Sequence, residues 1–357
     1  MANTTTATTT APAVTTKPTT FAAALNTAMS DAMEGDRSVC VFGEDVGTLG
    51  GVFRITDGLT QRFGADRCFD TPLAESGIAG MATGMAINGM RPVIEMQFDA
   101  FAYPALEQIF SHIAKTANRS RGRVRLPLVI RIPYGGGVGG VEHHCDSSEA
   151  YYAHTPGLKI YTPATVSDAY LMLREAIDSP DPVIFFEPKK LYWTKEAVDL
   201  SALRTQYEDA AQDESAPSAG VGAEGRAVVV REGTDVSLIS YGPSVSTALK
   251  AAEAAAEDGI SAEVLDLRSI VPFDDAALEA TVTKTGRAVV IAEAQGFVSV
   301  AAEIVARIQE RSFHSLSSPV KRVTGFDIPY PSPKLEEHHL PSVDRILDAL
   351  DELQWED

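Results

Sequence analysis

The sequence is poor in cysteine and has no long apolar segment. Only three cysteines occur among 357 residues, Cys40, Cys68 and Cys145. So small and odd a set does not form the disulfide framework of a secreted domain. We therefore expect a reducing compartment, the cytoplasm. No apolar run approaches the roughly 18 residues that a membrane-spanning helix requires, so we expect no membrane span.

Positive charge is also scarce. The chain has 30 Lys and Arg against 49 Asp and Glu, a formal net charge of −19. Nucleic acids and anionic membrane surfaces are bound through basic footprints. The composition therefore excludes both as the main partner, whereas an acidic surface suits a basic protein partner.

Arginine and a continuous apolar stretch are missing from the first 20 residues, which read MANTTTATTTAPAVTTKPTT. A signal peptide needs the apolar stretch, and a transit peptide usually carries arginines. We therefore expect residues 1–19 to be a disordered tail.

Helical and strand patterns alternate after the tail. The predicted strands are short and rich in Val and Ile, as is typical of parallel sheets buried on both faces. Residues 201–225 are acidic, small and interrupted by Gly and Pro, and we expect a linker there. The sequence thus predicts two open, doubly wound α/β domains, over residues 20–200 and 226–357.

A predicted helix over residues 72–89 has Pro72 as its first residue and Thr71 as its cap. Its glycines, three and four residues apart, lie on one side and allow close approach, either of packed neighbours or of a ligand. Glu75 projects from its first turn. That carboxylate either complements the helix dipole in solvent or binds a ligand.

The stretch YGGGVGGVEHHCDSSEAYYAH, residues 134–154, contains GxGxxG through Gly135, Gly137 and Gly140. No helix opens at the last glycine, so a flexible loop is the better interpretation than a dinucleotide site. The neighbouring histidines, His143 and His144, with Cys145, have poor spacing for zinc. A histidine at the carboxyl end of a strand suits acid–base chemistry, although a structural histidine is an equal alternative.

Glu44, Glu75 and His144 each follow a predicted strand. In an open α/β sheet the carboxyl ends of the strands share one edge, where ligands bind. The sequence therefore predicts that these three polar residues contribute to one site.

Long motifs in both halves resemble the beta subunit of the thiamine-diphosphate-dependent 2-oxo acid dehydrogenase component over about residues 20–355. They occur in order and include VFGEDVGTLGGVFRITDGL, RCFDTPLAESGIAGMATGMA, EMQFDAFAYPALEQI, EHHCDSSEAYYAHTPGLK, DPVIFFEPKKLYW, EVLDLRSIVPFD and RVTGFDIPYPSPKLEEHHLP. The resemblance implies a transketolase-like pyrimidine-binding domain followed by a transketolase C-terminal domain.

The same resemblance implies roles for five residues. Glu75 would hydrogen-bond the pyrimidine ring of thiamine diphosphate and stabilise its imino tautomer. Phe101 would pack on that ring without the hydroxyl that many relatives have, and Leu73 and Glu44 would line the cofactor pocket. His144 would transfer protons and pass the acyl group to the lipoyl arm of the next enzyme.

The Gly-Asp-Gly…Asn signature that binds magnesium and diphosphate in related single-chain enzymes is absent from this sequence. The resemblance implies that an alpha subunit supplies those ligands in an alpha-two, beta-two assembly, so we expect no magnesium ligand in this chain. It also implies a structural potassium loop around Ala176 and Asp181, and docking on a lipoyl-bearing acyltransferase core.

Two motifs, HHCDSSEAYYAHTPGLK and EPKKLYW, look most like the branched-chain type. Pyruvate-type relatives usually have His-Ser-Gln where this chain has His144-Cys145-Asp146. The expected activity is therefore oxidative decarboxylation of branched-chain 2-oxo acids. The alternatives are a pyruvate or acetoin enzyme, or a catalytically silent module that bridges the alpha subunit and the core.

Overall fold

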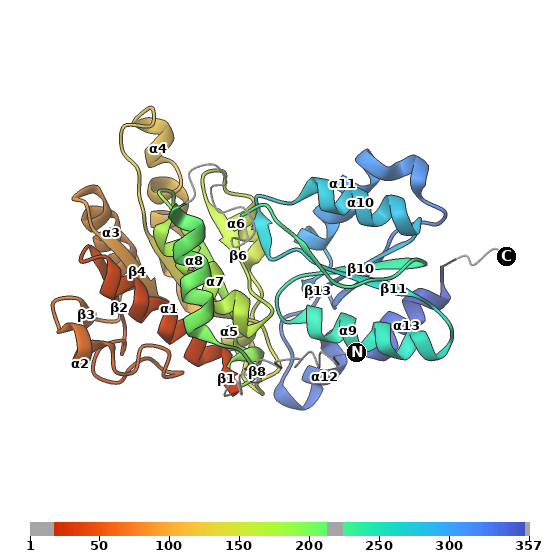
Figure 1. Cartoon of the computed structure of the whole chain (residues 1–357), viewed down its shortest axis with the longest axis horizontal. Helices are drawn as coiled ribbons and strands as arrows, with labels where there is room; N and C mark the ends of the chain where they lie inside the picture. The colour runs from red at the N-terminus through yellow and green to blue at the C-terminus, as the bar shows by residue number, and fades with distance from the viewer. Residues whose placement is uncertain (1–17, 213–223, 354–357) are drawn as a thin grey trace, which may run out of the picture.

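The computed structural model describes residues 18–212 and 224–353, which form two α/β domains lying side by side (Figure 1). Most of the predicted tail and residues 213–223 of the predicted linker lie outside the described residues. Within these ranges no helix is long and apolar enough to cross a membrane. The two predicted α/β domains are confirmed.

The first domain is built on a seven-stranded sheet with the order β12-β6-β7-β5-β4-β2-β3. All neighbouring strands are parallel except the edge pair β12 and β6. Their bounds are β2 (Val39–Gly43), β3 (Cys68–Asp70), β4 (Arg91–Glu95), β5 (Val129–Tyr134), β6 (Lys159–Tyr161), β7 (Val183–Pro188) and β12 (Ser269–Val271). The central strands β2, β5 and β7 are buried throughout, as their continuous apolar runs predicted.

Helices cover both faces of this sheet. One face packs against α1 (Phe21–Gly35), α7 (Val166–Asp178) and α8 (Leu200–Gln212), with α1 and α7 side by side. The other face packs against α3 (Glu75–Ile87), the 3₁₀ segment η1 (Ala100–Ala105) and the π-helical segment η2 (Gln108–Ile113). Shorter helices are α2 (Leu59–Phe63), α4 (Thr116–Arg119), α5 (Glu142–Cys145), α6 (Glu149–Ala153) and η3 (Lys189–Leu191).

The second domain has a five-stranded sheet with the order β14-β13-β10-β11-β9, parallel except for β9. Figure 1 shows α9 (Ser244–Glu257) and α13 (Val343–Asp351) on one face and α10 (Asp275–Thr285) and α11 (Val300–Ser312) on the other. The strands are β9 (Val228–Arg231), β10 (Val236–Ser240), β11 (Ala262–Asp266), β13 (Ala288–Gln295) and β14 (Lys321–Gly325). The short elements η4 (Phe313–Ser315), η5 (Pro333–Leu335) and α12 (Glu336–His339) complete it.

The domains share a strand. β12 belongs by sequence to the second domain but pairs antiparallel with β6 of the first, with Ser269 opposite Tyr161. Beside it, the Arg268 guanidinium forms an ion pair with Asp168 on α7. The backbone of the second half therefore completes the sheet of the first.

Two of the predicted segments differ from the structure at this level. Residues 201–212, which we expected to begin a linker, belong to α8 (Leu200–Gln212), because Leu200, Leu203, Tyr207 and Ala210 recur at helical spacing and pack on the α1/α7 core. The end of the predicted tail, β1 (Pro18–Thr20), pairs with β8 (Lys195–Ala197).

Candidate active site

The carboxyl ends of four adjacent strands carry the predicted site residues. Glu44 follows β2, Glu75 follows β3, Phe101 follows β4 and His144 follows β5. These strands are consecutive in the order β3-β2-β4-β5 and run parallel. At roughly 4.8 Å per strand, the four positions span roughly 14 Å of one sheet edge. This agrees with the prediction that polar groups after strands meet at one edge.

Glu75 is the first residue of α3, three residues later than the predicted helix start. The Thr71 amide donates to the carbonyl of Gly43 at 2.9 Å, which extends the pairing of β3 with β2 and holds the chain extended through Pro72. The half-buried Glu75 carboxylate thus lies at the positive end of a helix.

The Glu75 carboxylate makes no hydrogen bond or ion pair within residues 18–212 and 224–353. Another acid, Glu44, lies near enough to feel its charge: the pKa of Glu44 is raised by burial and by the carboxylates of Asp45 and Glu75. Two adjacent carboxylates without a cation or donor between them are arranged to receive a ligand that donates hydrogen bonds.

An aromatic cluster lies beside these acids, over the carboxyl ends of β4 and β5. The His144 ring is 4.3 Å from that of Phe98 and 5.3 Å from that of Phe101, measured between centroids. Phe101 also stacks on His143 at 5.9 Å with an interplanar angle of 21°. The structure thus brings Phe101 and His144 together and adds Phe98, which was not among the predicted site residues.

His144 is half-buried, and its imidazole makes no hydrogen bond in the part of the chain described here. Burial lowers its pKa, and the positive charges of His143 and Lys189 lower it further. At neutral pH the ring is therefore mainly neutral, with one nitrogen able to accept a proton and the other able to donate one.

Below the aromatic cluster, a buried ion network joins three strands. Arg131 on β5 contacts Glu95 on β4 at 2.7 Å and Glu187 on β7 at 2.6 Å, and all three side chains are at most 4% exposed. Tyr192 also donates to Glu187 at 2.7 Å. Burying these charges is costly, but the paired geometry ties together the strand ends that carry Phe101 and His144.

The glycines of α3 are on its exposed side. A Cβ atom added at Gly84 meets no atom within 4 Å, and at Gly77 and Gly80 it makes only ordinary contacts. The alternative that these glycines serve packing within the domain is therefore not supported. Exposed Met81 and Ile87 lie on the same helix, which leaves this surface open to a partner or ligand.

Replacing Gly84 with alanine is expected to raise the free energy of unfolding of the chain by about 0.5–1 kcal/mol. Alanine loses less backbone entropy than glycine in a helix, and its methyl group finds free space. Urea unfolding measures the change. Gly157→Ala is the contrasting control: its φ is +105° and its Cβ would collide with the carbonyl of Ala114, so it should destabilise.

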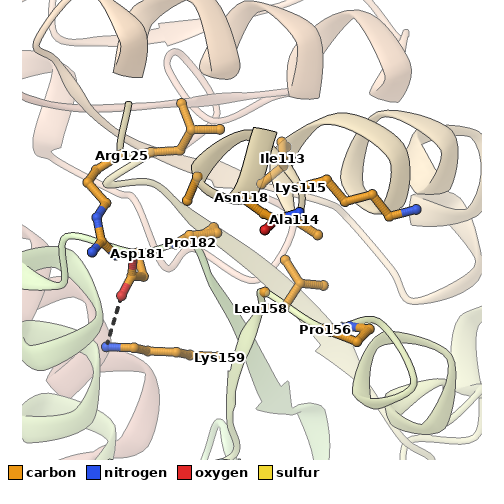
Figure 2. A pocket seen from close by; sticks show the side chains of 13 residues that line it. Ile113, Ala114, Lys115, Asn118, Arg125, Pro156, Leu158, Lys159, Asp181 and Pro182 are labelled. Carbon is orange, nitrogen blue, oxygen red and sulfur yellow. Dashed lines mark hydrogen bonds and ion pairs between the residues drawn. The ribbon is translucent and has the colours of Figure 1, made fainter. Parts of the chain in front are cut away.

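Leu73 and the predicted potassium loop do not lie with the other predicted site residues. Leu73 is 71% exposed, so its place in a cofactor pocket stays a prediction that requires a second chain. The predicted potassium loop lies near the amino ends of β6 and β7, at the opposite edge of the sheet, beside a hollow of about 630 Å³ (Figure 2).

The oxygen atoms of that loop are already engaged. Arg91 donates to the carbonyls of Ile177 and Ser179 at 2.9 and 3.3 Å. The Asp181 carboxylate contacts Arg125 and Lys159, the latter at 3.9 Å as Figure 2 marks. Arg91, Arg125 and Lys159 thus contact oxygen atoms of this loop, and potassium binding there stays a prediction.

Comparison with known proteins defines the class. Residues 17–194 match the family described as transketolase, pyrimidine binding domain, and residues 225–346 match transketolase, C-terminal domain. A solved structure titled "Split gene transketolase, inactive beta4 tetramer" superposes with a TM-score of 0.73 over 92% of this chain and 96% of that one. Its identity is 21%, so it shows the fold alone.

Curated relatives narrow the class further. The pyruvate dehydrogenase E1 component subunit beta of Leifsonia xyli is 49% identical over 92% of this chain and 92% of its own. The 3-methyl-2-oxobutanoate dehydrogenase subunit beta of Mycobacterium tuberculosis is 48% identical over 93% and 91%. The Bacillus subtilis pyruvate dehydrogenase E1 component subunit beta is 44% identical over 91% and 95%. The chain belongs to the beta subunits of 2-oxo acid dehydrogenase E1 components.

Proposed function

We propose that this chain is the beta subunit of a branched-chain 2-oxo acid dehydrogenase, active with thiamine diphosphate in an alpha-two, beta-two assembly. The observation that carries the proposal is the unengaged Glu75 carboxylate at the same sheet edge as His144. A carboxylate in that position has no structural partner within the described residues, whereas a pyrimidine ring offers it a hydrogen-bond donor.

The residues present fit the cofactor's pyrimidine end. Bound thiamine diphosphate supplies an electron sink for loss of carbon dioxide from a 2-oxo acid. Glu75 would hold a proton shared with the ring, and partial burial would strengthen that contact above its value in water. Phe101, which faces the histidines, would offer an apolar surface to the ring.

The diphosphate end does not fit this chain alone. Within the described ranges no group of three or more His, Cys, Asp or Glu side chains is arranged to hold a metal ion. A magnesium–diphosphate pair needs oxygen ligands, so we assign them to an alpha subunit. The exposed face of α3, next to Glu75, is the surface we propose for that contact.

His144 is proposed to move protons during acyl transfer to a lipoyl group of the acyltransferase core. Its mainly neutral ring both accepts and donates a proton near neutral pH, as general acid–base catalysis requires. The alternative of a catalytically silent bridging module offers no reason for Glu75 and His144 to occupy one edge of the sheet.

Substrate choice is the finer part of the proposal. The relatives include a pyruvate dehydrogenase subunit and a 3-methyl-2-oxobutanoate dehydrogenase subunit at nearly equal sequence identity. The HHCDSSEAYYAH segment supports the branched-chain type. The test is purification with the neighbouring alpha subunit, then turnover of 3-methyl-2-oxobutanoate, pyruvate and acetoin with thiamine diphosphate and magnesium. If kcat/KM is highest for 3-methyl-2-oxobutanoate, the proposal is supported. If it is highest for pyruvate or acetoin, the branched-chain assignment is wrong and the enzyme is of that other type.

A further inference from the structure

The glycine loop (residues 135–140) has an unusual backbone. Gly135, Gly137 and Gly139 all have positive φ, between 67° and 78°. Every second residue of the loop therefore has a left-handed backbone conformation, and the residues between them do not. Alternation of this kind turns successive N–H groups toward one side and forms a concavity that binds anions. The predicted loop is present between β5 and α5, and its backbone conformation is one that binds anions.

The anions in this concavity come from the second domain of the same chain. The Gly136 amide donates to Glu293 on β13. The Gly137 amide donates to Glu336 on α12 at 2.8 Å, and the Gly139 amide reaches the same carboxylate at 3.2 Å. Because these amides already bind protein carboxylates, the loop does not hold a dinucleotide phosphate.

Both carboxylates are buried and further supported. Glu293 and Glu336 are 7% and 8% exposed. Tyr330 donates to Glu336 at 2.6 Å, and the charges of Lys190 and Lys189 offset part of the burial that raises the Glu293 pKa. Buried carboxylates that accept backbone N–H groups make charge-assisted hydrogen bonds, which are the stronger class.

Several glycines of the loop have no room for a side chain, although a Cβ at Gly139 would meet no atom within 4 Å. A Cβ at Gly136 would overlap the Tyr330 hydroxyl, and one at Gly140 would lie 2.7 Å from the Cys145 sulfur. At Gly137 it would lie 2.7 Å from Lys190. The close approach of the second domain therefore requires glycine at 136, whereas neighbours within the first domain crowd Gly137 and Gly140.

The loop leads directly to His144. The Gly135 amide donates to the carbonyl of Asp146 at 2.9 Å, which closes the segment at its base. Cys145, adjacent to His144, is buried in a small cluster with Tyr330 and Leu340 of the second domain. The segments that flank the histidine, the glycine loop before it and Cys145 after it, thus both contact the second domain.

We infer that Glu336, with Tyr330, is a positioning residue for His144. The Glu336 carboxylate holds the glycine loop, and the loop in turn keeps the His144 imidazole against Phe98 and Phe101. Glu293 supports the same loop from β13. The catalytic consequence rests on the function proposed above, whereas the contact itself does not.

The test uses Glu336→Gln in the full chain, purified with the alpha subunit. Glutamine keeps the shape but removes the charge that strengthens the amide contacts. We expect hydrogen exchange of residues 134–145 to accelerate about tenfold. Transfer of the acyl group to a lipoyl domain should fall about tenfold, with KM for the 2-oxo acid unchanged. Glu337→Gln, the same change at the exposed neighbouring residue, should alter neither.

Tyr330→Phe is the milder variant in case Glu336→Gln does not fold. It removes one hydroxyl donor, and exchange of the loop should rise about threefold while the packing on Cys145 remains. Unchanged exchange of residues 134–145 in these variants overturns the inference. Accelerated exchange with normal acyl transfer leaves the contact but removes its role in positioning. Absence of any acyl transfer by the wild-type complex rejects the proposed function, and hydrogen exchange still decides on the contact.

Discussion

Glu75→Gln, purified with the alpha subunit, is expected to lose turnover of 2-oxo acids by on the order of 10²–10³-fold. Glutamine has the same shape as glutamate but cannot share a proton with the cofactor's pyrimidine ring. Since Glu75 makes no ion pair within the described residues, the substitution should leave folding and assembly intact. Steady-state decarboxylation with an artificial electron acceptor measures the loss, and gel filtration checks the assembly.

The matched control is Glu253→Gln, the same change on the exposed side of α9 in the other domain. It should retain wild-type turnover. Near-normal turnover of Glu75→Gln would remove this carboxylate from the mechanism, and with it the main support for a cofactor at this edge of the sheet.

His144→Ala is expected to lower acylation of a lipoyl domain by on the order of 10²–10⁴-fold, the usual contribution of general acid–base catalysis. Decarboxylation measured with an artificial acceptor should fall less, because that assay does not require transfer to the lipoyl group. Rapid-quench measurement of acylated lipoyl domain separates the two steps.

His143→Ala is the neighbouring control. The His143 side chain is 47% exposed, contacts its sequence neighbour Glu142 and stacks on Phe101. Since it is not the proposed proton-transfer group, its removal should leave most of the acylation rate. Equal losses in the two variants would assign the effect to the aromatic cluster as a whole, and an unaffected His144→Ala enzyme would assign the transfer elsewhere.

The position of the site followed from local sequence. Glu44, Glu75 and His144 were placed at one sheet edge because strand ends could be predicted from continuous apolar runs, and parallel strands end together. The start of α3 could not be predicted, since a hydrogen bond from Thr71 to the distant Gly43 overrides the helix signal at Pro72. Helix α8 was missed because its acidic composition concealed the spacing of Leu200, Leu203 and Tyr207.

Contacts between distant segments left no local signal. Arg131 and Glu187 are 56 positions apart in the sequence, and Gly137 and Glu336 are 199 apart. Arg131, Glu187 and Glu336 are unremarkable within their own windows of sequence, and Gly137 stood out only as part of a glycine tract. Only the assembled fold shows that the glycine tract binds carboxylates of the second domain.

The position of strand β12 affects how the polypeptide folds. Because Ser269–Val271 caps the margin of the first sheet, a chain still emerging from the ribosome before residue 269 leaves the backbone groups of Lys159–Tyr161 uncovered. An uncovered strand margin invites pairing with other chains. The first sheet is therefore complete only once residues 269–271 have been synthesised, which couples the folding of the two halves of the chain.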